Sequence, residues 1–470
     1  MALAETSTPG IVSLELAADT LTPVAAALRL GERCAFLLES VEGGVRYGRH
    51  SILGVRGRTL VVRDDQATLH GPGEDRSFRA RDPLEALRSV LPAAPSARED
   101  LPFPLASGVG YLAYEAASRW EQVATAASDP LGMPDAVLHL PEAVIIFDHL
   151  AQVVRLATLA TDDADQRLRS LADQLGRFSA GEAPVALPAL GEAAPPDDDA
   201  ARARFESNVA QLVEEIHAGE MLQAVLARRF SFATERSAFE IYRSLRRVNP
   251  SPYLFYLDLR DVAPGAALIG ASPELLVRVR GEEVVTRPIA GTRPRHDDPD
   301  IDARLEHELR HDPKELAEHA MLVDLARNDV GRVAQPASVE VPILRAVERY
   351  SHVMHLVSEV RGRLLPQLDA FDALRSTFPA GTVSGAPKVR AMQAIAELEG
   401  ERRGPYGGAI GFFSATDLEA AITIRSILVR DGVAHVQAGA GIVADSTPQR
   451  ESAEVTAKAR ATFVALGGQP

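Results

Sequence analysis

The chain has 470 residues and a formal net charge of −15, from 65 acidic side chains against 50 Lys and Arg. At about 150 residues per domain this length suggests about three units, but fused sheets often run larger. We therefore expect two domains, which can share a sheet system. The acidic balance leaves no global basic field for nucleic acid or an anionic membrane surface, so an anionic substrate would need a local cation. The lone cysteine, Cys34, excludes intramolecular disulfides and a Cys-based zinc cage.

The apolar runs of the chain are short. The longest, such as residues 143–147, fall far below the roughly 20 residues that cross a bilayer. The amino terminus also lacks the basic segment followed by an apolar one that marks a signal peptide. We therefore expect a soluble, cytoplasmic protein.

Residues 1–180 are expected to form an amino-terminal α+β domain. Short alternating runs with Gly-rich turns predict strands and hairpins there, while residues 83–91 and 166–178 have helical spacing. Residues 181–203 are rich in Pro, Ala and Asp without periodicity, which predicts a linker. Residues 204–465 alternate long helical patterns with strand-like runs and predict a catalytic α+β domain.

Two potential proton carriers lie in this second domain. Glu274 follows Ala-Ser-Pro, and His355 lies in an apolar stretch. Neither is decisive by itself, because a lone histidine in such a stretch is more often a core residue than a functional one. Their interpretation depends on the motifs around them.

A Glu-x-x-Glu pattern occurs twice on helical stretches, as Glu315 with Glu318 and as Glu451 with Glu454. Residues three apart share a helix face. An isolated pair is usually a solvated surface, but Glu318 precedes an apolar helix over 319–329 that should be buried and carry its carboxylates into a site. Four carboxylates repel one another unless a divalent cation lies between them, and hard oxygen ligands suit Mg²⁺.

Two Gly-rich segments, residues 404–411 and 438–442, flank an arginine. The first contains Tyr406, and Arg425 lies between the segments in what we expect to be an apolar strand. Either segment alone would be interpreted as a tight turn between strands. A buried arginine, however, needs an anionic partner, and amide N–H groups with a guanidinium can bind a carboxylate. The pattern predicts a site for a carboxylate substrate.

The segment 287–293 contains Pro-Ile-Ala-Gly-Thr and resembles the Pro-Ile-x-Gly-Thr signature of the chorismate-utilising enzymes. In the p-aminobenzoate branch of that family, position x is occupied by a nucleophilic Lys, whereas in the anthranilate branch it is occupied by Ala. Ala290 cannot attack a ring carbon as a lysine amine can. The resemblance therefore implies that free ammonia supplies the amino group.

Gln223 further limits which branch of the chorismate-utilising family the chain resembles. It lies in segment 218–229, where isochorismate and salicylate synthases resemble one another in having a Lys that activates water. A Gln side chain cannot deprotonate water, so ammonia remains as the attacking nucleophile. Glu220, Ala224 and Ala227 depart from the commoner anthranilate pattern, as conservative changes.

Four more segments, residues 36–40, 249–253, 381–388 and 449–458, extend the resemblance over most of the chain. On these motifs the chain is similar to the anthranilate synthase branch of the family. The resemblance implies an α+β fold, namely a layered α/β sandwich with a central antiparallel β core and two intertwined subdomains.

The resemblance also implies the site, residue by residue. Glu318 and Glu454 match Mg²⁺ ligands, supported by Glu315 and Glu451. Glu274 matches the acid that protonates the departing C4 hydroxyl, and the other residues matched to catalysis are His355, Gln223 and Thr382. The chorismate contacts would be Gly291, Thr292, Tyr406, Arg425, Gly439, Ala440 and Gly441. A separate pocket for tryptophan, the feedback inhibitor, would be formed by Glu39, Ser40, Pro252, Tyr253 and Leu254.

The implied activity is the conversion of chorismate and ammonia into anthranilate and pyruvate. Cys34 has no flanking Gly, unlike the nucleophile of a glutaminase, so a glutamine amidotransferase subunit (component II) is expected to supply the ammonia in a hetero-oligomer. Two alternatives stay open: a 2-amino-2-deoxyisochorismate synthase, which stops before elimination, and a non-catalytic regulator that binds chorismate or tryptophan. His355 favours elimination, and the intact set of Glu318, Glu454, Glu274 and Arg425 favours catalysis.

Overall fold

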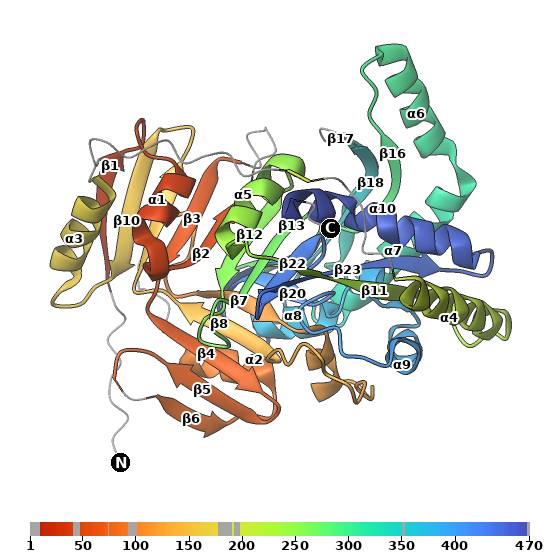
Figure 1. Ribbon diagram of the computed structural model, residues 1–470, viewed down its shortest axis with the longest axis horizontal. Coiled ribbons are helices and arrows are strands. Elements are labelled where there is room, and N and C mark those ends of the chain that lie inside the picture. The colour runs from red at the N-terminus through yellow and green to blue at the C-terminus, as the bar shows by residue number, and fades with distance from the viewer. Residues whose placement is uncertain are drawn as a thin grey trace.

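The computed structural model describes residues 10–40, 48–73, 75–92, 101–176, 190–191, 198–349 and 353–467. Two large antiparallel sheets form its centre, and helices cover them (Figure 1). The predicted α+β class is confirmed. In the part of the chain that is described, no helix has both the length and the apolar character needed to cross a membrane.

The first sheet has 11 strands. In spatial order they are β1 (Ile11–Ala17), β10 (Val153–Leu159), β9 (Ala143–Asp148), β3 (His50–Val55), β2 (Cys34–Glu39), β12 (Tyr253–Asp258), β13 (Ala267–Ser272), β22 (Ser426–Arg430), β23 (Val433–Ile442), β11 (Gln223–Ala233) and β19 (Gly385–Ala386).

The second sheet has 12 strands, 11 of them along one path. In order these are β16 (Ile289–Pro294), β18 (Val353–Arg363), β15 (Glu283–Thr286), β14 (Leu275–Arg280), β21 (Asp417–Ile422), β20 (Ala409–Phe413), β7 (Gly108–Leu112), β8 (Ala136–Leu140), β4 (Arg58–Arg63), β5 (Gln66–His70) and β6 (Arg76–Arg79). The remaining strand, β17 (Glu340–Arg349), pairs with β18.

Both sheets combine strands from the two ends of the chain, as the mixture of red and blue arrows in Figure 1 shows. In the first sheet β2 pairs with β12, with Glu39 opposite Leu254. In the second, β7 pairs with β20, with Leu112 opposite Ala409. Most of the predicted linker, residues 181–189 and 192–197, lies outside the described residues. The division into domains 1–180 and 204–465 stays a prediction about how the chain folds.

Three large apolar clusters hold the layers together. One lies between the sheets, where Phe36 and Phe255 of the first meet Phe412 of the second. Another packs the first sheet against helices α1 (Pro23–Leu30), α3 (Ala164–Gly176), α4 (Asp199–His217), α5 (Ala238–Val248), α9 (Lys388–Glu399) and α10 (Pro448–Leu466). The third packs the second sheet against α2 (Pro83–Val90), α7 (Pro313–Gly331) and α8 (Ala370–Thr377).

The predicted helices are confirmed where the chain is described. Residues 83–91 form α2 up to Val90, and residues 166–176 belong to α3. The expected apolar helix over 319–329 is the main part of α7, which begins where the Asp312 side chain accepts hydrogen bonds from the backbone of Lys314 and Glu315. Helix α6 (Pro299–His311), which precedes α7, projects away from the two sheets (Figure 1).

Candidate active site

Arg425 lies where the chain crosses from one sheet to the other. Strand β21 of the second sheet ends at Ile422, and β22 of the first begins at Ser426. The prediction that Arg425 is inside a strand is therefore wrong: its φ is +51°, a left-handed conformation that L residues adopt rarely and that often marks functional sites. A strand continuing through Arg425 would have stayed in one sheet.

The guanidinium of Arg425 is partly buried and has no hydrogen bond or ion pair with any described residue. Burial lowers the pKa of this guanidinium, while the nearby Tyr406, Glu274 and Glu454 act in the opposite direction. A charge in this position is costly unless it meets an anion. The arrangement suits a bound carboxylate.

The Gly-rich strand β23 passes close to Tyr406 and Gln223. A Cβ on Gly439 would lie 3.0 Å from the Tyr406 hydroxyl, and one on Gly441 would lie 2.5 Å from Nε2 of Gln223. Only glycine fits at these two positions without displacing a neighbour. Ala440 between them is fully buried. The structure therefore brings these five predicted residues to one place, at the β11–β23 pair.

Glu274 is buried between β13 and β14 and faces the turn that carries Thr382. The Thr382 hydroxyl donates to Oε1 of Glu274 over 3.0 Å. Burial raises the pKa of Glu274 from 4.5 to about 7, although the Thr382 bond and the charges of Arg425 and Lys458 oppose the rise. At neutral pH this carboxyl is protonated in part of the molecules, as a general acid requires.

Gly291, Thr292 and His355 meet on the β16–β18 pair, where Thr292 lies opposite His355. Nδ1 of His355 is 3.0 Å from both the Gly291 carbonyl and the Thr292 hydroxyl. Burial lowers the pKa of His355, so its imidazole is neutral at neutral pH. Gly291 has φ +68°, and a Cβ there would lie 2.8 Å from Leu309.

The predicted metal carboxylates lie on α7 and α10. Burial raises the pKa of Glu318, and the Glu315 and Glu454 carboxylates raise it further. Burial also raises the pKa of Glu451, again with a contribution from Glu454. Helices from two distant parts of the sequence thus direct negative charge toward a common region.

These carboxylates do not form a single cluster. Glu315 pairs with Arg293 at 3.0 Å and Glu454 pairs with Lys458 at 2.7 Å. Across the described ranges, no three His, Cys, Asp or Glu side chains are close enough together to hold a metal ion. The donors still match Mg²⁺ in kind, because all four are hard oxygens in a region of excess negative charge.

Lys458 is a site residue that the sequence did not single out. Its Nζ donates to the Gly439 carbonyl over 3.1 Å. Its positive charge partly offsets the burial that raises the pKa of Glu274, Glu318 and Glu451. The sequence contains one sign of this role, because Lys458 follows Glu454 by four residues and therefore shares its helix face. Lys458 is the cation between the Gly-rich strand and the carboxylates.

The five predicted tryptophan contacts line a second cavity, of about 210 Å³. Glu39 and Ser40 come from β2 and its end, and residues 252–254 from the start of β12. Ile410, Phe412, Glu419 and Ala421 of the second sheet complete its wall. The Ser40 hydroxyl is buried without a hydrogen-bond partner among the described residues. The Glu39 carboxylate is already held by Arg246 at 2.7 Å and Tyr242 at 2.6 Å.

Known proteins resemble this chain over nearly its full length. A family model described as chorismate binding enzyme matches residues 34–463. The chain is 47% identical to anthranilate synthase component 1 of Streptomyces coelicolor, with 95% of this chain and 87% of the relative covered. It is 45% identical to the protein of that name from Thermus thermophilus, with 96% of each covered.

Solved structures agree with this result. The crystal structure of anthranilate synthase component I from Streptococcus pneumoniae superposes with a TM-score of 0.78 at 36% identity, covering 98% of this chain and 100% of the other. MenF, the menaquinone-specific isochorismate synthase of Escherichia coli, superposes with a TM-score of 0.72 at 22% identity, covering 98% and 95%. At that lower identity the likeness concerns the fold alone.

Proposed function

This chain belongs to the chorismate-binding enzyme family, and we propose that it is the aminating subunit of an anthranilate synthase. It converts chorismate and ammonia into anthranilate and pyruvate in tryptophan biosynthesis. The observation that carries the proposal is the position of Arg425 near the buried acid Glu274, with no hydrogen bond or ion pair from its guanidinium to any described residue. Gln223 and Ala290 stand at the two positions where sister enzymes resemble one another in having Lys.

Substrate binding falls to the residues around the sheet crossing. The Arg425 guanidinium and the Tyr406 hydroxyl hold the enolpyruvyl carboxylate through charge-assisted hydrogen bonds. Backbone groups of Gly439, Ala440 and Gly441 approach the substrate closely because the glycines have no side chains. Held in this way, the ring presents its C4 hydroxyl to Glu274.

Ammonia adds at C2 of the ring while the C4 hydroxyl departs. Glu274 donates its proton to that hydroxyl, which leaves as water. Thr382 orients the acid through its hydrogen bond. Loss of the C2 proton and of pyruvate then aromatises the ring, and the neutral imidazole of His355, held by Gly291 and Thr292, is placed to assist this elimination.

We assign Mg²⁺ binding to Glu318 and Glu454, with Glu315 and Glu451 in support. When bound, Mg²⁺ supplies positive charge that neutralises the ring carboxylate of chorismate. The support for this assignment is the concentration of carboxylates on α7 and α10 and the raised pKa values of Glu318 and Glu451. Lys458 balances part of the same charge.

The test is to incubate the purified chain with chorismate, Mg²⁺ and ammonium salt at alkaline pH. Anthranilate, identified by its fluorescence and mass together with pyruvate, is the expected product. Accumulation of 2-amino-2-deoxyisochorismate without pyruvate would assign the chain to the alternative that stops before elimination. Binding of chorismate without turnover would support the non-catalytic alternative.

We propose that ammonia reaches this chain from a glutamine amidotransferase subunit in a cytoplasmic hetero-oligomer. Cys34 is buried, and burial raises the pKa of its thiol to about 12, so it is not a nucleophilic thiolate. The chain alone should therefore use ammonium salts and leave glutamine unused until the second subunit is added. Glutamine-dependent anthranilate formation by the chain alone, unaffected by Cys34→Ala, would contradict this.

A further inference from the structure

Arg403 is the largest fully buried side chain in the described part of the molecule, with 1% of its surface exposed. Its Nε and Nη2 donate to the Glu399 carboxylate over 2.8 and 2.5 Å. Nη1 donates to the Val383 carbonyl over 2.7 Å, and Nη2 donates to the Val225 carbonyl over 2.6 Å. One planar group thus ties together α9, the turn η3 (Gly381–Val383) and β11.

Each of these bonds holds a segment that carries a site residue. Val383 follows Thr382, which orients Glu274. Val225 follows Gln223 by two residues and lies opposite Gly441 on β23. The Glu399 carboxylate also accepts the backbone N–H of Ala227, opposite Gly439. The Arg403–Glu399 pair therefore sets the distance between the Gly-rich strand pair and the turn beside the acid.

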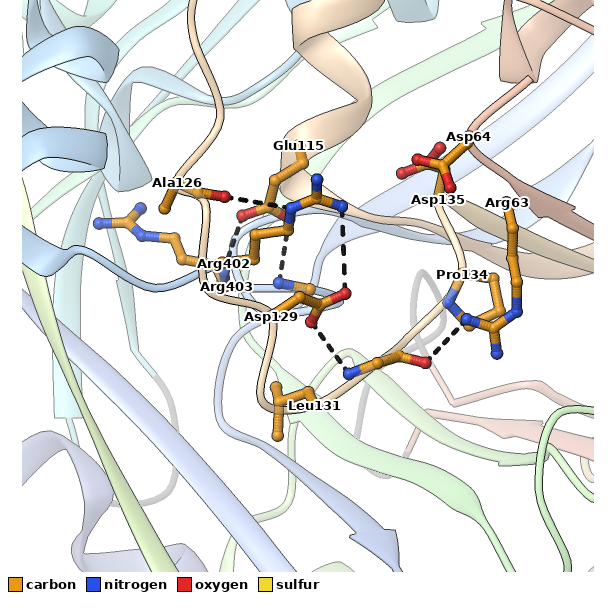
Figure 2. A network of polar contacts seen from close by, with 12 residues as sticks. Arg63, Asp64, Glu115, Ala126, Asp129, Leu131, Pro134, Asp135, Arg402 and Arg403 are labelled. Atoms are coloured by element: carbon orange, nitrogen blue, oxygen red, sulfur yellow. Dashed lines mark hydrogen bonds and ion pairs between the residues drawn. The ribbon is translucent and has the colours of Figure 1, made fainter.

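Aromatic contacts extend the arrangement to Tyr406. The Arg403 guanidinium carbon lies 5.7 Å from the centre of the Tyr406 ring and 4.5 Å from that of Tyr114, within the range of cation–π attraction. The turn leading to Tyr406 is fixed from the other side, because the Glu115 carboxylate accepts the backbone N–H groups of Arg403 and Gly404 over 2.6 and 3.0 Å (Figure 2). The Tyr406 ring is thus contacted by Arg403, and the turn that leads to it is fixed by Glu115.

We propose that Arg403 is the positioning residue of the chorismate site, which fixes Tyr406, Thr382 and the Gln223–Gly441 contact relative to one another. The inference rests on the proposed function for the identity of the substrate. Arg403 contacts no substrate itself. Lysine cannot replace it, because an ammonium group retains the charge but cannot form the same bidentate bond to Glu399 while also reaching two carbonyls in different directions.

The first test is a double-mutant cycle between Arg403→Lys and Tyr406→Phe. Tyr406→Phe should lower kcat/KM for chorismate by about 10- to 100-fold in the wild-type background, as expected for loss of a hydrogen bond to a charged group. In the Arg403→Lys background its effect should shrink to about twofold or less, because Tyr406 is already displaced. Arg403→Lys alone should raise KM more than it lowers kcat. Equal effects of Tyr406→Phe in both backgrounds would overturn the proposal.

Arg402→Lys is the matched control, since this neighbouring arginine is partly exposed and pairs with Asp129 at 4.0 Å (Figure 2). It should leave KM and kcat within about twofold of wild type, as for an ordinary surface change. If Arg403→Lys fails to fold, Glu399→Gln takes its place. This variant keeps the hydrogen bonds from Arg403 to the Val383 and Val225 carbonyls and weakens the ion pair between positions 399 and 403.

Hydrogen exchange tests the same proposal without turnover. In Arg403→Lys, the segments 223–227, 381–386 and 404–411 should exchange at least tenfold faster, and residues 34–39 and 253–258 around the second cavity should not change. If hydrogen exchange in Arg403→Lys accelerates equally in all segments, or does not accelerate, Arg403 does not position the site and the proposal is contradicted. Failure of the wild-type chain to turn over chorismate would contradict the proposed function, whereas the exchange pattern would still decide the role of Arg403.

Discussion

Glu274 combines a catalytic and an energetic role in one carboxyl group. Its surroundings disfavour the charged form, which raises its pKa from 4.5 to about 7. The same surroundings let it keep a proton that it can donate to a leaving hydroxyl. A side chain suited to this task therefore weakens the fold when it ionises.

Glu274→Gln should separate these two roles. The folded-state pKa is raised, so the stability that Glu274 contributes is fully present below about pH 4.5 and is lost as the pH rises through about 7. A neutral Gln avoids this loss, and the variant should exceed wild type in free energy of unfolding by on the order of 3 kcal/mol at pH 8 or above. Urea unfolding at pH 5 and pH 8 would show whether the difference grows with pH.

The same variant should lose about 10²- to 10⁴-fold in kcat, the usual contribution of a general acid. For wild type, the rate per concentration of neutral ammonia should fall above about pH 7, because Glu274 loses its proton there. A pH-independent stability difference would show that folding does not raise the pKa of Glu274. An active Glu274→Gln enzyme would show that another group protonates the leaving hydroxyl.

At the scale of elements, helices α7 and α10 carry the metal proposal. Glu318→Ala or Glu454→Ala should abolish Mg²⁺-dependent turnover and leave the fold intact, because each removes one carboxylate from a region of like charge. The measurement is anthranilate formation against Mg²⁺ concentration, with chelator as a second arm. Asp324→Ala is the control, since this side chain is on α7 but exposed and paired with Arg327. Full activity of both glutamate variants, or turnover in excess chelator, would exclude these helices as the metal site.

Strands β2 and β12 carry the inhibitor proposal. Tryptophan should inhibit wild type, and Ser40→Phe should resist inhibition while keeping activity, because its ring would fill part of the cavity of about 210 Å³. Inhibition curves with a direct measurement of tryptophan binding by calorimetry would check this. Ser13→Phe, on an exposed position of the edge strand β1, should remain sensitive. No effect of tryptophan on wild type would mean that residues 38–40 only end a strand.

At the scale of the whole molecule, the two sheets make the halves of the chain depend on each other. The strand pairs β2–β12 and β7–β20 each join the amino-terminal part to the carboxy-terminal part. A half expressed alone would expose long sheet edges, which pair with other chains. Independent folding of the predicted domain 1–180 would need that edge to be protected.

Fragments 1–191 and 192–470 test this dependence. We expect neither fragment to show a cooperative thermal transition alone and the two co-expressed fragments to assemble into an active complex, because each supplies strands to both sheets. Circular dichroism and sedimentation would measure folding and association. A chain cut between residues 191 and 198 after folding is the control and should remain assembled. A sharp transition of fragment 1–191 alone would establish it as an autonomous domain.

Features that depend on neighbouring residues can be predicted from the amino-acid sequence. The periodicity of residues 319–329 predicted α7, and the glycines at 439 and 441 predicted a close backbone approach. Motifs at 287–293 and 381–388 predicted the family and most of the residues that the structure gathers around Arg425. These inferences succeeded because helix formation, chain flexibility and motif order are written in neighbouring residues.

Features that depend on distant segments become visible only in the folded chain. Arg425 was expected in a strand because its neighbours are apolar, but the chain crosses between sheets at that point. The carboxylates of α7 and α10 lie near one another yet pair with Arg293 and Lys458 instead of forming one cluster. The burial of Arg403 follows from the meeting of β11, η3 and α9, three segments that are distant in the sequence. Burial and charge pairing are set by what the rest of the chain brings to a residue, and that information is not contained in the residue's own segment.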